Sequence, residues 1–218
     1  MSDQHLILLA VMLPFAGALG IMLSGRWPNL REAVTLVTAA STGAVVIQLY
    51  LRFTDGAQLA IDLAEPIPGL ALRFEIEPLG MLFALVASAL WLITSIYAIG
   101  YMRGHHEHHQ TRFYALFAIA IGSTLGAAFS GNLLSLFLFY EILTVSTYPL
   151  VAHSGTDEAR RGARTYIAIL LASSIALLLF AILITYTITG TLEFRHGGIL
   201  AGKLDPAWAG ILYALFLF

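Results

Sequence analysis

Six long runs of apolar residues divide the chain. They are separated by stretches that contain charged residues, proline or glycine, and they cover residues 6–23, 33–51, 79–101, 113–129, 133–152 and 166–187. A helix that crosses the hydrocarbon core of a bilayer needs about 20 mainly apolar residues. The runs are too long and too continuously apolar for barrel strands, and in lipid a spanning segment must satisfy its backbone hydrogen bonds internally. The pattern therefore predicts an all-α integral membrane protein with six full transmembrane helices.

A seventh apolar run starts near Trp208 and continues to Phe218. It has roughly half the length that a spanning helix requires. We expect it to be the start of a seventh helix, and we interpret the chain as a truncated or split gene product. The first five residues lack the basic segment and the cleavage site of a signal peptide, so the first run is expected to remain as a span.

The loops give the orientation and one further element. Seven of the 11 basic residues would lie on the inner side if the chain starts outside, and these are Arg26, Arg31, Arg103, Arg112, Arg160, Arg161 and Arg164. The rule that inner loops carry the excess of Lys and Arg therefore favours an N-terminus on the outer face. The second loop contains Pro66, Pro68 and Gly69 between short alternating stretches, a pattern that predicts a small outer hairpin at the membrane surface.

Composition excludes several classes of function. The chain has 59% hydrophobic and 11% charged residues and a net charge of -2, so it offers no basic face for nucleic acid. It contains no cysteine, which excludes disulfides and redox centres held by sulfur. No pair of nucleophile and base, no cofactor loop and no metal motif is visible, so we predict neither a cofactor nor an active site of its own.

One acid lies deep in a predicted span. Glu141 is near the middle of the fifth run, which contains no basic residue to pair with it. An acidic residue at the centre of a membrane helix costs about 2.5–3.5 kcal/mol even on lenient scales, and such residues usually face a bundle interior or a wet cavity. Low-dielectric surroundings favour the neutral carboxyl, and a nearby cation favours the charged one. We therefore predict that Glu141 belongs to a proton or cation pathway; the alternative is a protonated side chain that only hydrogen-bonds a facing helix.

The same helix carries groups that could assist. Thr144 and Tyr148 follow Glu141 by three and seven residues and should share its face. Pro149 removes one backbone donor, so the Val145 carbonyl loses its normal partner and a kink or a bound water is expected there. His153, at the inner end of the helix, has a side chain suited to proton exchange with water. An ordinary interfacial histidine is the alternative interpretation.

The loop after the third run is rich in histidine. Residues 104–110 read Gly-His-His-Glu-His-His-Gln. Four histidines beside one acid resemble a metal-binding tract, but the loop has no second ligand group, and polar connectors of this kind are common at membrane surfaces. We therefore predict no metal site here.

Four segments of the chain resemble one known family. They are Ser95-Ile-Tyr-Ala-Ile-Gly-Tyr-Met-Arg, Arg112-Phe-Tyr-Ala-Leu-Phe, Ser130-Gly-Asn-Leu-Leu-Ser-Leu-Phe-Leu-Phe-Tyr-Glu-Ile-Leu-Thr and Ser146-Thr-Tyr-Pro-Leu-Val-Ala-His. They resemble the antiporter-like subunits of respiratory complex I, and most of all the D-type subunit of Mrp-type multisubunit cation/proton antiporters and the equivalent hydrogenase subunits.

The resemblance implies a fold of fourteen helices with two inverted five-helix repeats. Residues 1–112 would form an N-terminal three-helix region with the outer hairpin, and residues 113–218 an incomplete first repeat. It also implies that Glu141 pairs with a lysine on a broken seventh helix, just past Phe218; Lys203, the only lysine here, lies in the preceding loop.

Two functions remain open from the sequence. The first is a proton-translocating subunit of a multisubunit Na⁺/H⁺ antiporter or of a complex I-like or hydrogenase complex in the plasma membrane, with protons, Na⁺, lipid and other membrane subunits as partners. The second is a non-conducting membrane subunit that anchors its neighbours.

Overall fold

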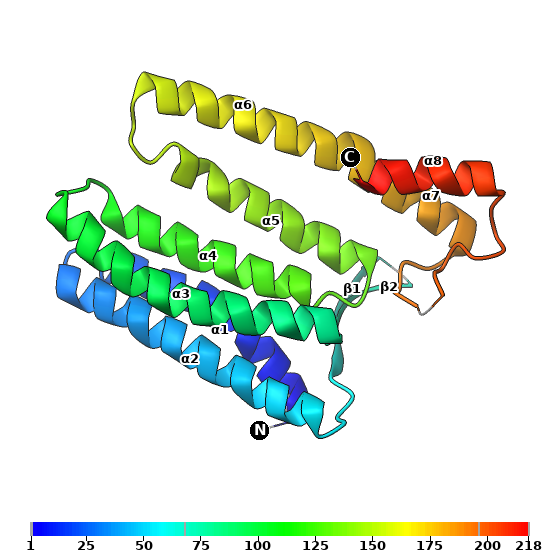
Figure 1. Ribbon diagram of the computed structural model, residues 1–218, viewed down its shortest axis with the longest axis horizontal. Helices are drawn as coiled ribbons and strands as arrows, with labels where there is room; N and C mark the ends of the chain where they lie inside the picture. The colour runs from blue at the N-terminus through cyan, green and yellow to red at the C-terminus, as the bar shows by residue number, and fades with distance from the viewer. Residues whose placement is uncertain (1, 68, 196, 218) are drawn as a thin grey trace.

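The chain folds into a bundle of antiparallel helices with one small β-hairpin (Figure 1). A computed structural model describes residues 2–67, 69–195 and 197–217, so Pro68 of the predicted turn and Phe218 at the end of the seventh run lie outside the described residues. The helices are α1 (Asp3–Leu23), α2 (Pro28–Thr54), α3 (Pro78–Gly104), α4 (Gln110–Ala128), α5 (Leu133–Val151), α6 (Asp157–Ser173), α7 (Phe180–Thr189) and α8 (Pro206–Leu217). A π-helix, η1 (Ser174–Leu179), joins α6 to α7.

Six helical segments are long and apolar enough to cross a membrane, which confirms the predicted number. They are α1 to α5 and the continuous segment Asp157–Thr189, which comprises α6, η1 and α7. Several helices extend beyond the apolar runs into polar residues, and in α6 a side-chain cap stabilises the extension. At the start of α6, Thr156 Oγ1 accepts a hydrogen bond of 3.1 Å from the Ala159 N–H, and Asp157 and Glu158 lie in the first turn.

The seventh run forms α8, a helix of 12 residues that packs beside η1 and α7. At about 1.5 Å per residue it extends roughly 18 Å, which is shorter than the hydrocarbon core. The described part of this run is therefore helical but shorter than a span, and a seventh transmembrane helix stays a prediction.

The loops gather at two opposite ends of the bundle (Figure 1). We call one end the hairpin side; it holds Ser2, the β-hairpin and the segment after α7. We call the other the histidine side; it holds the α1–α2, α3–α4 and α5–α6 loops. Ion pairs link segments within each end, such as Arg52 with Asp3 on the hairpin side and Arg103 with Glu32 on the histidine side.

The predicted hairpin is present. Strands β1 (Ala60–Ile67) and β2 (Leu70–Glu75) pair antiparallel, with Ala60 opposite Glu75 and Ile61 opposite Phe74. Hydrogen bonds from β2 to the start of α5 involve Ser135, which accepts from the Arg73 N–H at 2.8 Å, and Asn132, the N-cap of that helix. The Asn132 side chain accepts from the Ser135 N–H at 2.8 Å and donates to the Ala71 carbonyl at 2.7 Å. The hairpin therefore closes one end of the bundle and fixes the start of the Glu141 helix.

Close packing around α4 depends on glycine. A methyl group at Gly126 would overlap the Phe139 ring of α5, and one at Gly122 would lie 2.8 Å from the Phe15 ring of α1. A methyl group at Gly80 would collide with the Ala128 carbonyl. Small residues at such contacts let helices approach closely in a membrane, where van der Waals packing drives their association. These contacts hold α4 between α1 and α5.

Candidate functional site

Glu141 lies at the middle of α5, the ninth of its 19 residues. Its side chain is partly buried, and its Oε1 atom is buried without a hydrogen bond to any group in the described part of the chain. A buried carboxyl oxygen without a partner is unfavourable, and groups of this kind concentrate at functional sites. The role of Glu141 in a proton or cation pathway stays a prediction.

The carboxyl lines a groove between α4 and α5 with a volume of about 440 Å³. Leu116 and Ile119 line it from α4, and Ile142, Val145, Ser146 and Pro149 line it from α5. The Ser146 hydroxyl donates to the Leu143 carbonyl at 2.8 Å, so its oxygen can still accept a hydrogen bond. Val145 is exposed, and the groove therefore opens on the surface of the described bundle. Glu141 and Ser146 are the polar side chains on this otherwise apolar wall.

The structure does not bring the two predicted helper residues into this groove. Thr144 is buried and Tyr148 is half-buried, and neither lines the groove. The neighbouring Thr147 instead shares a hydrogen bond of 3.2 Å with the Tyr166 hydroxyl of α6. Thr144 and Tyr148 follow Glu141 at helical spacing. The groove, however, lies on the neighbouring face of α5, which carries Val145, Ser146 and Pro149. Sequence reasoning missed Ser146 for this reason.

His153 lies on the histidine side, two residues beyond the end of α5. Its ring meets the Phe113 ring edge-on at 5.5 Å, and both ring nitrogens are buried without a hydrogen bond to the described residues. Burial lowers the pKa of His153, and the nearby charge of Arg112 lowers it further, while Glu107 acts in the opposite direction. The neutral ring is therefore favoured. About 15 Å of helix separates Glu141 from Val151, so His153 does not contact the acid.

The histidine-rich loop adopts a specific backbone shape. His106 and His109 have φ values of 53° and 56°, in the left-handed region that most side chains avoid, and His105 stacks on Tyr101 at 4.2 Å. Within the ranges that the structure describes, no group of three or more His, Cys, Asp or Glu side chains is arranged to hold a metal ion.

A buried cluster of charges on the histidine side was not predicted. Glu32 of α2 accepts hydrogen bonds from Arg103 Nε at 3.0 Å and from Arg31 Nη2 at 3.3 Å. Arg31 also donates to Gln110 at 2.7 Å and to Thr111 at 3.2 Å, and its guanidinium lies 5.3 Å from the centre of the Tyr114 ring. Arg31 and Glu32 are each only 5% exposed. The sequence signal was an Arg-Glu pair at the start of an apolar run, which by itself indicates only a loop charge.

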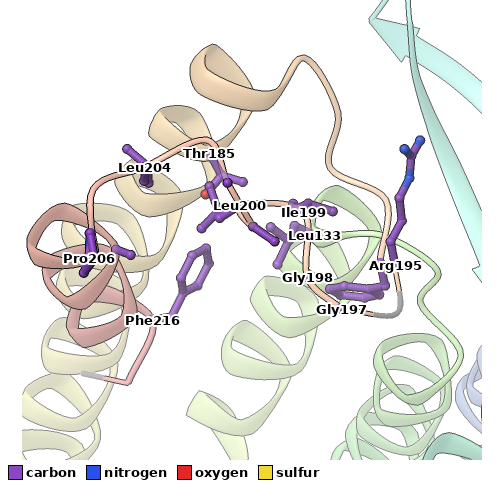
Figure 2. A pocket seen from close by; sticks show the side chains of 14 residues that line it. Leu133, Thr185, Arg195, Gly197, Gly198, Ile199, Leu200, Leu204, Pro206 and Phe216 are labelled. Atoms are coloured by element: carbon purple, nitrogen blue, oxygen red, sulfur yellow. The ribbon is translucent and has the colours of Figure 1, made fainter.

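A larger cavity, of about 640 Å³, lies at the hairpin side and does not include Glu141 (Figure 2). Its wall comes from Leu133 of α5, Thr185 of α7, Phe216 of α8 and the glycine-rich segment before α8. The Arg195 side chain extends away from the centre of this cavity, and it pairs with Glu193 at 3.4 Å. The described lining carries no acid and no base directed into the space.

Two family descriptions match most of the chain. Residues 130–218 match the family described as "NADH:quinone oxidoreductase/Mrp antiporter, TM", and residues 69–114 match "NADH-Ubiquinone oxidoreductase (complex I), chain 5 N-terminus". The first match includes the whole of α5 and therefore Glu141. The chain belongs to the complex I and Mrp antiporter family of membrane subunits.

Relatives of this family align along nearly the whole chain. The D-type subunit of the Na(+)/H(+) antiporter of Alkalihalophilus pseudofirmus is 25% identical over 98% of the chain, and a putative antiporter subunit mnhD2 of Staphylococcus epidermidis is 25% identical over 88%. These alignments cover 43% and 38% of the two relatives. The chain thus spans less than half the length of the curated relatives it matches.

Solved structures share the fold. A chain of the membrane-bound sulfane sulfur reductase, an archaeal respiratory membrane complex, matches all of this chain and 44% of its own length with a TM-score of 0.82 and 21% identity. A chain of the Mrp complex from Dietzia sp. DQ12-45-1b matches 96% of this chain and 22% of its own length with a TM-score of 0.77 and 21% identity. The helical arrangement of this chain is therefore shared with chains of these two membrane complexes.

Proposed function

We propose that the chain is the N-terminal part of a proton-translocating membrane subunit and that Glu141 binds and releases the proton. The observation that carries this proposal is a carboxyl oxygen buried at mid-helix with no partner among the described residues, on the wall of a groove. An acid at this depth is rare unless it has a function.

The chemistry follows from the surroundings of the carboxyl. An apolar wall favours the neutral form, whereas a cation that approaches the groove favours the ionised form and releases the proton. The family resemblance implies such a cation, a lysine just past Phe218 on the broken seventh helix that α8 begins. Movement of that charge toward and away from Glu141 would then drive uptake and release of the proton.

We place Thr144, Tyr148 and His153 on the route between Glu141 and the histidine side. Thr144 and Tyr148 lie one and two turns from the acid on α5, and hydroxyl groups can pass a proton through bound water. His153 follows the end of the same helix. Its neutral ring could accept a proton from the aqueous phase.

The whole protein would act within a complex. The relatives bear the names of antiporter subunits, and the similar solved structures are multisubunit membrane complexes. We therefore propose other membrane subunits as partners, protons and Na⁺ as the transported ions, the plasma membrane as the location, and a fourteen-helix fold for the complete subunit. The histidine side, with seven of the 11 basic residues, would face inward and the N-terminus outward.

The test replaces Glu141 in the complete subunit, assembled in its complex in inverted membrane vesicles. Glu141→Gln keeps the size of the side chain and removes its titration, so proton flux followed with a pH-sensitive dye should fall to the background. Glu141→Asp should retain part of the flux. Glu158→Gln, which removes an exposed acid at the start of α6, is the matched control and should leave the flux unchanged.

The same experiment separates the two functions left open by the sequence. Normal flux with Glu141→Gln, in a complex that assembles normally, would refute the role of Glu141 and support a non-conducting subunit that anchors its neighbours.

A further inference from the structure

Four buried polar groups on α2, α3 and α4 lack a hydrogen-bond partner among the described residues. They are Thr42 Oγ1, Trp91 Nε1, Ser95 Oγ and the Tyr114 hydroxyl, and each residue is at most 1% exposed. We call this set the polar seam. Other hydroxyls on the same helices behave differently. Thr35 and Thr38 donate to carbonyls four residues earlier at 2.9 and 2.7 Å, which is the usual solution for a buried hydroxyl in a helix.

The four groups belong to one region of the bundle. Trp91 and Tyr114 pack in the same core cluster, together with Ala39 and Ala98. Thr42 follows Ala39 by three residues on α2, and Ser95 follows Trp91 by four on α3, so both lie on the helix faces that enter this cluster. The seam is therefore a local concentration of unpaired polar atoms between three packed helices.

The seam is polar at one end and closed at the other. At the histidine side it meets the buried charges, because the Arg31 guanidinium lies over the Tyr114 ring. Toward the hairpin side the same faces of α2 and α3 become apolar, with Val46, Leu49 and Met81 packed in a separate core cluster. The polar region thus starts at the Arg31–Glu32–Arg103 cluster and ends inside the bundle at Thr42 and Trp91.

The chemistry of the four groups fits one ligand. An indole N–H only donates, whereas the hydroxyls of Thr42, Ser95 and Tyr114 both donate and accept. A water molecule that accepts from Trp91 can donate to a hydroxyl oxygen, and buried waters of this kind usually make about three hydrogen bonds to polar groups that would otherwise stay unpaired. In a membrane, bulk water cannot relax into the site to satisfy such groups.

We propose that the polar seam binds a short chain of water molecules that enters at the Arg31–Glu32–Arg103 cluster, ends at Thr42 and joins α2, α3 and α4 by hydrogen bonds. This chain of water molecules ends inside the bundle, because the apolar cluster of Val46, Leu49 and Met81 separates it from the hairpin side. It is also separate from the Glu141 groove. Leu116 lines that groove from α4, and its side chain points about 200° away from Tyr114, two residues earlier.

The test detects water directly at Trp91. In the complete subunit within its complex in lipid nanodiscs, 5-fluorotryptophan is placed at position 91, and its ¹⁹F shift is compared in H₂O and D₂O. The same label at Trp27, which is exposed, gives the fully hydrated value; 4-fluorophenylalanine at Phe129, which is fully buried in the apolar cluster, gives the dry value. We expect a clear solvent isotope shift at Trp91 and none at Phe129.

A second measurement ties the water to the seam. Thr42→Val preserves the shape of the side chain and removes its hydroxyl. It should reduce the isotope shift at Trp91 to roughly half or less, because a buried water needs two to four polar partners. Absence of an isotope shift at Trp91 without the Thr42→Val change, with the Trp27 signal responding normally, would overturn the proposal and indicate that the seam is dry. The fluorine label of the first measurement leaves the indole N–H of Trp91 and the three seam hydroxyls in place, and the result is independent of the role of Glu141.

Discussion

Replacement of Glu32 by glutamine should destabilise the bundle by about 3–5 kcal/mol, the usual effect of removing one partner of a buried ion pair. Glu32 forms ion pairs with two arginines. Arg103 Nη2 pairs with its Oε2 atom, and Arg31 Nη2 lies 3.3 Å from its Oε1 atom. Glutamine keeps the size of the side chain but removes the negative charge that balances these two cations.

Most of this loss should come from Arg31. Arg103 is about half exposed, so its guanidinium can turn to water when Glu32 is neutralised. Arg31 is buried and would keep its hydrogen bonds to Gln110 and Thr111 without any counter-charge. The side chains of Arg52 and Asp3, which pair at 3.3 Å, are 51% and 34% exposed, so Asp3→Asn should cost only about 0–1 kcal/mol. The two acid-to-amide changes therefore differ mainly in burial.

The assay is thermal unfolding of the complete subunit in its complex, in nanodiscs, monitored by protease resistance. Glu32→Gln should lower the midpoint far more than Asp3→Asn. Adding Arg31→Met to Glu32→Gln should recover part of the loss, because the uncompensated buried cation is then removed. Equal losses for Glu32→Gln and Asp3→Asn, or a double variant less stable than Glu32→Gln alone, would refute the assignment of the cost to Arg31.

Two further outcomes are expected. The Gly80→Ala variant should be less stable than the Gly100→Ala variant on the same helix by about 1–3 kcal/mol in the same unfolding assay. The added methyl group meets the Ala128 carbonyl at position 80 and open space at position 100. Equal stability of the two variants would contradict the close contact at Gly80. The folded protein holds the pKa of His153 below 6.5, so as the pH falls the unfolded chain binds a proton at a higher pH than the folded protein does. The stability of the fold should therefore decrease as the pH drops from 6.5 toward the lowered pKa of His153. His153→Gln should weaken this pH dependence, and an unchanged pH profile would argue against it.

The sequence predicted the helices because the membrane imposes one rule on long apolar runs. Each of the six runs is helical, because a single segment in lipid can satisfy its backbone hydrogen bonds internally only as a helix. The ends were less predictable. α6 begins at Asp157, nine residues before the apolar run at 166, because Thr156 caps a polar first turn outside the run.

The sequence predicted the position of Glu141 along its helix but not the surroundings of its side chain. The depth of Glu141 follows from counting residues in α5, but the face on which its groove lies depends on how α4 packs against that helix. The contact of Glu32 with Arg103 joins positions 71 residues apart, and no periodicity in a single sequence reports such a pairing. The polar seam was hidden for the same reason, since each of its members looks like an ordinary hydroxyl or indole until three helices are assembled.

α4 separates the two polar systems of this chain. On one face Tyr114 meets Arg31 and the polar seam, and on another Leu116 and Ile119 form the wall of the Glu141 groove. The helix is held by close contacts at Gly122 and Gly126, where the facing aromatic rings leave no space for displacement. A change at the charged cluster would therefore reach the Glu141 groove only by displacing α4 against these contacts, since Leu116 and Ile119 of the same helix form the groove wall.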